Sequence, residues 1–268
     1  MSQNRLLKQL RAGQVILGLA NMYPAAGIIE GMCKGWDFVW IDGQHGEMSY
    51  DSCLRAAQAA TATGIDSLIR VPGHDHRDLG MFADLAPAAI MVPMVDSVEQ
   101  AKGIVQGLRF PPLGNRSYGG RRIIDLHGRN YVQETELLVV AQIETLEAAA
   151  CADEIAAVDG IDLLFFGPDD MKVRMGIPIN TPINENDELR KAMAQTATAA
   201  RNAGKFAGTV AGTTAAAEMV TELGYQLLTG GGDIAFLRTL AAEKLSALRE
   251  ITASTCETPD GTSSSGVY

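Results

Sequence analysis

Two types of side chain suited to proton transfer and anion binding stand where apolar runs of the sequence end. The stretch WIDGQHG (40–46) places Asp42 and then His45 directly after a run of apolar residues. Arg70 lies near the end of another such run, SLIRV. An imidazole titrates close to neutral pH, so it can take or give a proton during a reaction. A guanidinium keeps its charge and can stabilise an oxyanion by charge-assisted hydrogen bonds.

Two carboxylates occupy similar positions later in the chain. Glu144 closes the run LLVVAQIE, and Asp170 follows DLLFFGPD. Neither has a Cys or His neighbour in the sequence, which favours a hard divalent cation with waters and substrate completing an octahedral shell. Such a cation can chelate a 2-oxo acid and stabilise an enolate derived from it. Together these five residues predict an enzyme that forms an enolate from a 2-oxo acid.

The residues around these positions predict the elements that carry them. Eight short apolar runs punctuate the chain, at 15–21, 38–43, 67–71, 89–94, 137–144, 162–168, 206–212 and 225–231. They do not alternate apolar with polar residues, which is typical of parallel strands buried on both faces. Helical patterns separate them, several beginning with Ser, Thr or Asn and ending with Gly. This rhythm predicts a single α/β domain, a (β/α)8 TIM barrel. A doubly wound open sheet is the alternative, but the first turn lacks its Gly-rich signature.

In a barrel of this kind the carboxyl ends of the strands meet at one mouth, where active sites form. We therefore expect the polar strand-end residues to become neighbours there. Two long connections, 109–130 after the fourth strand and 172–186 after the sixth, are expected at the same face.

Composition limits the possible partners and setting. The 268 residues carry a net charge of −10 without a basic cluster, which argues against nucleic acid and anionic membranes as partners. No apolar stretch approaches the roughly 18 residues of a membrane span. Four scattered cysteines predict a reducing, cytoplasmic location. Residues 1–251 are expected to form the catalytic barrel, and the Ser/Thr/Gly-rich tail 252–268 is expected to be disordered.

A set of motifs gives the chain a family resemblance. They appear in order as WIDGQHG, IRVPG, IMVPMVDSVEQAK, RFPPLGNRSYGG, AQIET and DGIDLLFFGPDD. Over roughly residues 5–250 the sequence resembles the HpcH/HpaI aldolase/citrate lyase family, and within it the metal-dependent (class II) pyruvate aldolases. These include 4-hydroxy-2-oxoheptanedioate aldolase and the 2-keto-3-deoxy-sugar-acid aldolases.

The resemblance implies an enzyme, a lyase that cleaves 2-oxo-4-hydroxy acids to pyruvate and an aldehyde with Mg²⁺, Mn²⁺ or Co²⁺. It implies reversibility, a side activity as an oxaloacetate decarboxylase, and a homo-oligomer. That oligomer is a hexamer built as a trimer of dimers, in which the final helix packs on a neighbouring subunit. The resemblance assigns the following roles: metal binding to Glu144 and Asp170; catalysis to His45, Arg70, Asp42 and, across a subunit contact, Asp84; substrate binding to Arg70, Gln142, Gly167, Pro168 and Asp169.

Two departures from the family pattern concern substrate binding. Gln44 stands where the family often has Glu, and Asp169 and Lys172 follow the Gly-Pro turn in place of a small residue and a serine. Two other functions remain open from the sequence. One is a carbon–carbon lyase acting on a coenzyme A thioester, as citrate and malyl-CoA lyases do. The other is a barrel that binds a ligand without turnover.

Overall fold

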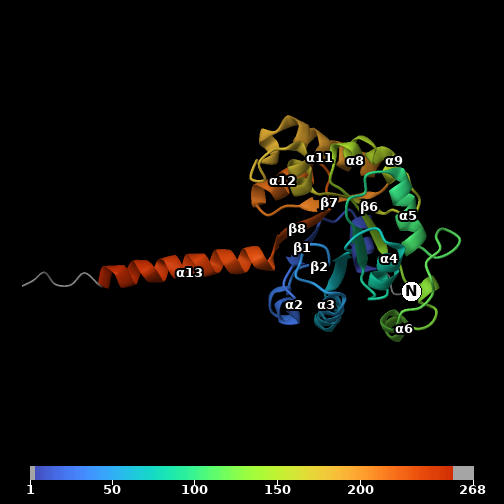
Figure 1. Cartoon of the computed structure of the whole chain (residues 1–268), viewed down its shortest axis with the longest axis horizontal. Helices are drawn as coiled ribbons and strands as arrows, with labels where there is room; N and C mark the ends of the chain where they lie inside the picture. Colours follow the sequence, from blue (N-terminus) through green and yellow to red (C-terminus); the bar gives the residue numbers. More distant parts are fainter. Residues whose placement is uncertain (1–3, 256–268) are drawn as a thin grey trace, which may run out of the picture. The chain divides into compact units, whose positions relative to one another are not determined.

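The computed structural model describes residues 4–255 and divides the chain into two units, Met1–Asp233 and Ile234–Tyr268. In the first unit, eight parallel strands form a closed barrel in sequence order, with β8 paired to β1 (Figure 1). The predicted (β/α)8 barrel is thereby confirmed. The strands are β1 Ile16–Asn21, β2 Phe38–Asp42, β3 Asp66–Arg70, β4 Ala89–Val92, β5 Leu138–Ile143, β6 Leu163–Phe166, β7 Phe206–Val210 and β8 Leu227–Gly232.

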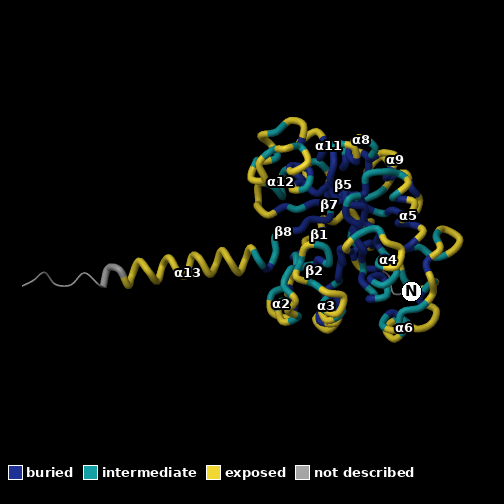
Figure 2. Tube along the Cα trace, viewed as in Figure 1, coloured by how far each residue is buried: buried dark blue, intermediate teal, exposed yellow. Residues whose placement is uncertain are grey.

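Burial of the strands explains their unbroken apolar sequences. Every residue of β2, β4, β5 and β6 is buried, because one face meets the barrel interior and the other meets the surrounding helices (Figure 2). One apolar cluster fills the interior, and a second joins the outer strand faces to the helices. Leu6, Leu7 and Leu10 of α1 (Arg5–Arg11) belong to the interior cluster, so this helix closes one end of the barrel.

The remaining helices follow the strands as expected, with several short additions. They are α2 Ala26–Met32, α3 Tyr50–Thr63, α4 His76–Ala83, α5 Val98–Leu108, α6 Arg121–His127, α7 Tyr131–Glu134, α8 Leu146–Ala150, α9 Ala152–Ala156, α10 Pro168–Met175, α11 Asp187–Asn202 and α12 Thr214–Glu222. The side-chain oxygens of Ser49, Ser97 and Thr145 cap α3, α5 and α8 by accepting backbone N–H bonds.

The expectation that the long connection 109–130 lies at the mouth of the barrel is wrong. Helix α5 separates this segment from β4, and the segment leads through α6 and α7 into β5. A segment that joins a helix to the next strand starts at the amino-terminal side of the sheet, opposite the mouth. The sequence pattern correctly predicted that the helix ends near Leu108. It did not show on which side of the barrel that end lies.

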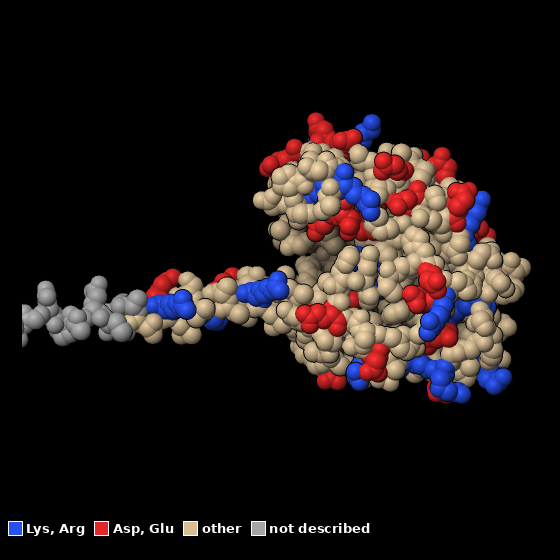
Figure 3. All heavy atoms as spheres, in the orientation of Figure 1, with Lys and Arg blue, Asp and Glu red and all other residues tan. Residues whose placement is uncertain are grey.

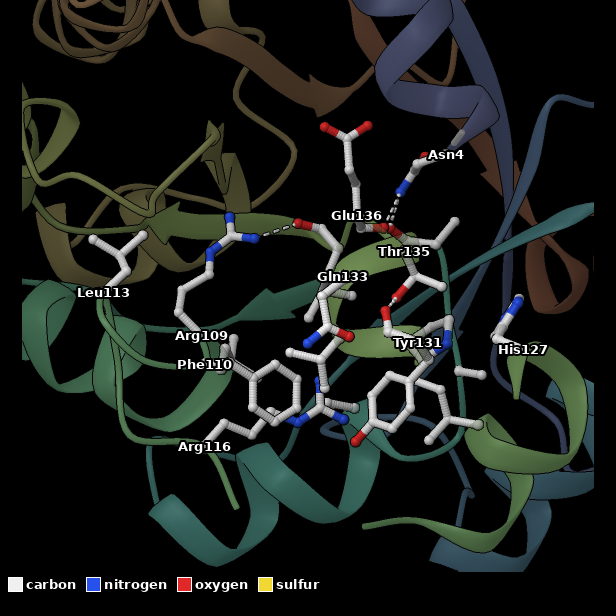
Figure 4. Close-up of a pocket in the computed structure, with 18 of the residues that line it drawn as sticks. Asn4, Arg109, Phe110, Leu113, Arg116, His127, Tyr131, Gln133, Thr135 and Glu136 are labelled. Carbon is white, nitrogen blue, oxygen red and sulfur yellow. Dashed lines mark hydrogen bonds between the residues drawn. The ribbon is translucent and has the colours of Figure 1, made fainter. Parts of the chain in front are cut away.

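A cavity of about 480 Å³ marks where this segment packs (Figure 4). Ala88 and Leu137, which immediately precede β4 and β5, line it together with Phe110 and Tyr131. It therefore lies at the amino-terminal end of the strands, away from the polar residues that follow their carboxyl ends. The connection 172–186 after β6 is different: it precedes the long helix α11, which begins only at Asp187, so it does lie on the mouth side.

The described part of the second unit belongs to the helix α13, Asp233–Thr255, which begins at the last residue of the first unit. The predicted tail falls mostly on residues 256–268, outside the described part of the chain, so the domain boundary at 251 stays a prediction. Within residues 4–255, no helix is long and apolar enough to cross a membrane. Acidic and basic side chains are interspersed over the barrel surface seen in Figure 3.

Candidate active site at the barrel mouth

The barrel brings together most of the residues that the sequence singled out. Asp42 ends β2, Arg70 ends β3, Gln142 lies in β5, and Glu144 follows it directly. Each of these four side chains is buried. Because parallel strands of one barrel end at the same mouth, residues far apart in the sequence become neighbours.

Asp42 and Arg70 form a buried ion pair at the mouth. Adjacent strands place the two residues directly opposite each other in the β2–β3 register. Arg70 donates from Nε to Asp42 Oδ1 at 2.9 Å and from Nη2 to Oδ2 at 2.6 Å. Its guanidinium also lies 4.8 Å over the ring of Trp40, and its Nη1 points to Gln142 Oε1 at 3.5 Å. These contacts fix the plane of the guanidinium and leave Nη1 on the side of Gln142.

The charge state of Asp42 is set by these contacts. Burial opposes ionisation of the carboxyl, but the hydrogen bonds and charge of Arg70 outweigh it, and the pKa of Asp42 is held below its ordinary value. Asp42 therefore carries a negative charge that balances Arg70 at any working pH.

The same carboxylate shapes the turn that carries His45. Asp42 Oδ1 accepts backbone N–H bonds from Gln44 at 3.1 Å and from His45 at 3.3 Å. A Cβ at Gly43 would lie 2.7 Å from the Arg70 carbonyl oxygen, so only glycine fits there. The His45 side chain is exposed, and within residues 4–255 its ring makes no hydrogen bond. The expected role of Asp42 toward the His45 ring stays a prediction, since the contact seen is to the backbone.

Glu144 and Asp170 lie side by side, as the sequence predicts. Burial raises the pKa of Glu144, and repulsion from the neighbouring Asp170 carboxylate raises it further, to about 7. The backbone N–H of Met94, which donates to Glu144 Oε2 at 2.9 Å, opposes this only in part. Two carboxylates in contact at low dielectric repel each other, and a cation between them removes that repulsion.

The donor set fits a hard divalent cation. Among the described residues, no three His, Cys, Asp or Glu side chains gather at one point, so only Glu144 and Asp170 are available as charged ligands. Magnesium-like ions commonly take one or two carboxylates and fill the rest of their shell with water and substrate oxygens. The pKa of Glu144 is raised by its burial and by its contact with Asp170, and a cation bound beside the pair would lower it.

Helix α10 presents its first turn to the same place. Pro168 is its first residue, and Gly167 precedes it in an extended conformation. A Cβ at Gly167 would lie 2.7 Å from the Glu144 side chain, so glycine allows this close approach. Free backbone N–H groups at a helix start favour a carboxylate.

Asp169 does not carry its charge into the mouth. Its side chain is 69% exposed, and Lys172 Nζ lies 3.4 Å from its Oδ1. Lys172 is itself buried and also donates to the Ile179 carbonyl oxygen at 2.8 Å. Asp169 and Lys172, which together make up one of the two departures from the family pattern, thus pair with each other on α10.

Asp84 is not among the mouth residues of one chain. It follows α4, and its carboxylate accepts a hydrogen bond from Arg116 Nη2 at 2.6 Å. The Arg116 guanidinium is buried and stacks 5.0 Å over the Phe110 ring. Within the described residues Asp84 makes no hydrogen bond to His45, and its catalytic role across a subunit contact stays a prediction.

The sequence did not reveal two further residues of the site. Met94 adopts a φ of 53°, rare for a residue with a side chain, and this conformation aims its N–H at Glu144. No sequence pattern signals it, although Pro93 before it marks the strand end. Trp40 looked like an ordinary core residue of WIDGQHG, yet its ring supports Arg70.

Comparison with known proteins gives a consistent result. The family model for HpcH/HpaI aldolase/citrate lyase matches residues 25–239. The chain is 41% identical over 181 residues to 4-hydroxy-2-oxovalerate aldolase of Novosphingobium aromaticivorans, covering 65% of this chain and 68% of that protein. It is 30% identical over 237 residues to hydroxypyruvate/pyruvate aldolase of Delftia acidovorans, covering 87% and 86%.

Solved structures agree with the sequence comparison. A HpcH/HpaI aldolase/citrate lyase family protein from Burkholderia cenocepacia J2315 superimposes with a TM-score of 0.84 at 27% identity. The match covers 92% of this chain and 99% of that one.

The raised pKa of Glu144 predicts how the stability of the metal-free protein depends on pH. An unfolded glutamate loses its proton near pH 4.5, whereas folded Glu144 keeps it up to about pH 7. Between these values only the folded state holds the proton, so the free energy of unfolding falls as pH rises. At pH 8, the free energy of unfolding of the metal-free Glu144→Gln variant should exceed that of the wild type by about 3 kcal/mol. This difference should vanish near pH 4.

Urea unfolding at a series of pH values in EDTA measures this difference. Glu147→Gln, a change at an exposed glutamate of α8, is the matched control and should alter stability little at any pH. A wild type that is as stable as Glu144→Gln at pH 8 would contradict the raised pKa of Glu144.

Proposed function

Because the chain belongs to the HpcH/HpaI aldolase/citrate lyase family, we propose that it is a divalent-metal-dependent aldolase that cleaves 2-oxo-4-hydroxy acids to pyruvate and an aldehyde. The observation that carries the proposal is the contact of Glu144 with Asp170 beside an Arg70 that Asp42 holds in place. This arrangement offers a cation site and a fixed guanidinium next to each other. The names of the aldolase relatives support the same reaction class.

Glu144 and Asp170 would hold the cation. When bound, a Mg²⁺, Mn²⁺ or Co²⁺ ion would supply positive charge that orients the 2-oxo acid and favours its enolate. The N–H groups at the start of α10, beside Gly167 and Asp169, would bind the carboxylate of the pyruvyl part. Gln142 lies between this helix start and Arg70, where it can donate to the same substrate.

Two side chains have separate roles in the proposed reaction: His45 transfers the proton, and Arg70 stabilises the negative charge. In cleavage, His45 takes the proton of the C4 hydroxyl as the C3–C4 bond breaks and the aldehyde forms. The electron pair of that bond passes to C3 and the C2 oxygen, which becomes an enolate oxygen. Arg70 donates to this oxygen and cannot lose its own charge at working pH. Protonation at C3 then gives pyruvate and balances the proton that His45 received.

Removal of the cation tests the metal requirement. Pyruvate release from a panel of 2-oxo-4-hydroxy acids should stop in EDTA and return with Mg²⁺, Mn²⁺ or Co²⁺. Glu144→Ala and Asp170→Ala should abolish the metal-dependent reaction while circular dichroism shows an intact fold. Full turnover in either variant, or after thorough chelation, would exclude this site. Release of a coenzyme A product from malyl or citramalyl thioesters alone would instead favour the alternative lyase.

Two variants separate proton transfer from charge stabilisation. His45→Ala should slow aldol cleavage strongly yet spare oxaloacetate decarboxylation, which has no C4 hydroxyl to deprotonate. Arg70→Ala should slow both reactions, by about 10²–10³, because both form the same enolate. Measured kcat for the two substrates decides this; equal, small losses in both variants would show that other groups handle the proton and the charge.

We also propose that the protein is a homo-oligomer, a hexamer arranged as a trimer of dimers, in which α13 packs on a second copy. Leu17 faces outward from β1 and is 45% exposed. On α13, Leu240, Leu245 and Leu248 are 56%, 52% and 61% exposed. Exposed apolar residues of this number on one helix favour burial against a partner.

Light scattering after size exclusion tests the assembly. At micromolar concentration the wild type should have about six times the chain mass of 28.5 kDa. The double substitution Leu240→Glu/Leu248→Glu should yield smaller species with an unchanged barrel spectrum. Glu243→Gln on the same helix is the control and should leave the assembly intact, whereas a monomeric wild type would rule the proposal out.

A further inference from the structure

Asp233 is a buried acidic residue that has no role in the proposed reaction so far. It follows β8 directly, and the residue is 0% exposed. Its Oδ2 accepts hydrogen bonds from Asn21 Nδ2, from Met22 N and from Tyr23 N, each at 3.0 Å. A carboxylate taken out of water is unfavourable unless donors of this kind surround it. These bonds therefore hold the segment that leaves β1 against the end of β8.

The segment after β1 in turn supports the turn that carries His45. The Met22 carbonyl oxygen accepts a hydrogen bond from Glu47 N at 2.9 Å. A Cβ at Gly46 would lie 3.0 Å from this oxygen and 2.5 Å from the Asp42 carbonyl oxygen. The turn and the segment after β1 thus pack with no room for a side chain between them. A displacement of Met22 would therefore move the turn as well.

The backbone around His45 is held from two sides. On one side, Asp42 Oδ1 accepts two backbone N–H bonds of the turn. On the other side, the N–H of Glu47 is bound to Met22, whose own N–H is bound to Asp233. The His45 ring is exposed and makes no hydrogen bond within residues 4–255, so its position depends on the backbone that carries it.

We propose that Asp233 is a positioning residue that acts through Met22 and Glu47 to place the His45 ring for proton transfer. This role rests on the proposed aldolase function, in which His45 is the base. A small displacement of a catalytic group slows the step that it serves by up to about 10²-fold. Arg70 is held by its own ion pair, so loss of Asp233 should affect proton transfer and leave formation of the enolate unchanged.

Replacement of Asp233 by alanine removes the acceptor and tests the proposal. The kcat of Asp233→Ala for aldol cleavage should fall about tenfold, while that for oxaloacetate decarboxylation stays within about twofold of the wild type. Asp233→Asn keeps one oxygen acceptor without the charge and should lose about threefold, again in cleavage alone, which carries the test if Asp233→Ala does not fold. Equal losses in both reactions, or no loss in cleavage, would overturn the positioning role.

Thr213→Ala is the matched control for these variants. Thr213 also stands at the start of a helix that follows a strand, and its Oγ1 accepts a hydrogen bond from Ala216 N at 3.1 Å. This contact is exposed and lies within one connection, so its loss should leave the kcat of both reactions unchanged. A loss of cleavage in Thr213→Ala as large as in Asp233→Ala would show a general effect of helix capping and overturn the specific role of Asp233.

Combination with His45→Ala shows whether Asp233 acts through the base. Residues that act as one unit give losses that do not add. The double variant His45→Ala/Asp233→Ala should therefore cleave 2-oxo-4-hydroxy acids no more slowly than His45→Ala alone. A further tenfold loss in the double variant would show that Asp233 acts on another group and would overturn the proposal.

Amide hydrogen exchange gives a readout that does not depend on activity. In EDTA, residues 43–48 should exchange faster in Asp233→Ala than in the wild type, because the acceptor of the Glu47 N–H is no longer fixed. Thr213→Ala should leave the exchange of these residues unchanged. Equal exchange of residues 43–48 in Asp233→Ala and the wild type would overturn the link between Asp233 and the turn.

Failure of the aldolase function and failure of the positioning role give different results. A wild type that cleaves no 2-oxo-4-hydroxy acid with Mg²⁺, Mn²⁺ or Co²⁺ overturns the aldolase function and the catalytic role of Asp233 together. A wild type that cleaves them, while Asp233→Ala is as fast as the wild type, overturns the positioning role alone.

Discussion

The buried ion pair between Asp42 and Arg70 is the constraint on which the rest of the mouth depends. One carboxylate accepts two bonds from the guanidinium and two from the backbone of the turn that carries His45. A charge taken out of water is strongly unfavourable unless it is paired, so neither partner can move without the other. The pair therefore fixes the position of the cationic group and of the proposed base relative to each other. Trp40 beneath and Gln142 beside the guanidinium complete its support.

Glu144 and Asp170 form a second pair of contacting side chains at the mouth, and here both members are acids. Glu144 and Asp170 repel each other, and the N–H of Met94, aimed by an unfavourable backbone conformation, compensates only in part. Such local instability is tolerated because the barrel around it is closed and its strands are buried on both faces. One side of the mouth thus has its charges paired within the chain, and the other holds the two carboxyl groups of the proposed cation site.

Periodicity and strand order made much of the fold and part of the site predictable from the sequence. Unbroken apolar runs identified all eight strands, and polar residues after them pointed to Asp42, Arg70, Glu144 and Asp170 because strand ends of a barrel converge. The remaining features depend on which atoms meet once the chain has folded. The partner of Asp42 is Arg70, a contact set by β2–β3 register, and Arg116 pairs with Asp84 through a segment that was expected at the mouth. The conformation of Met94 and the support given by Trp40 leave no periodic signal.

The role of Asp42 in holding Arg70 is tested most directly by the kcat of Asp42→Asn in two reactions, aldol cleavage and oxaloacetate decarboxylation. If Asp42 holds the guanidinium that stabilises the enolate, both reactions should fall by a similar factor, since both form that enolate. A variant that loses aldol cleavage but keeps decarboxylation would contradict this role, because it would show that Asp42 serves the base His45 and leaves the function of Arg70 unchanged.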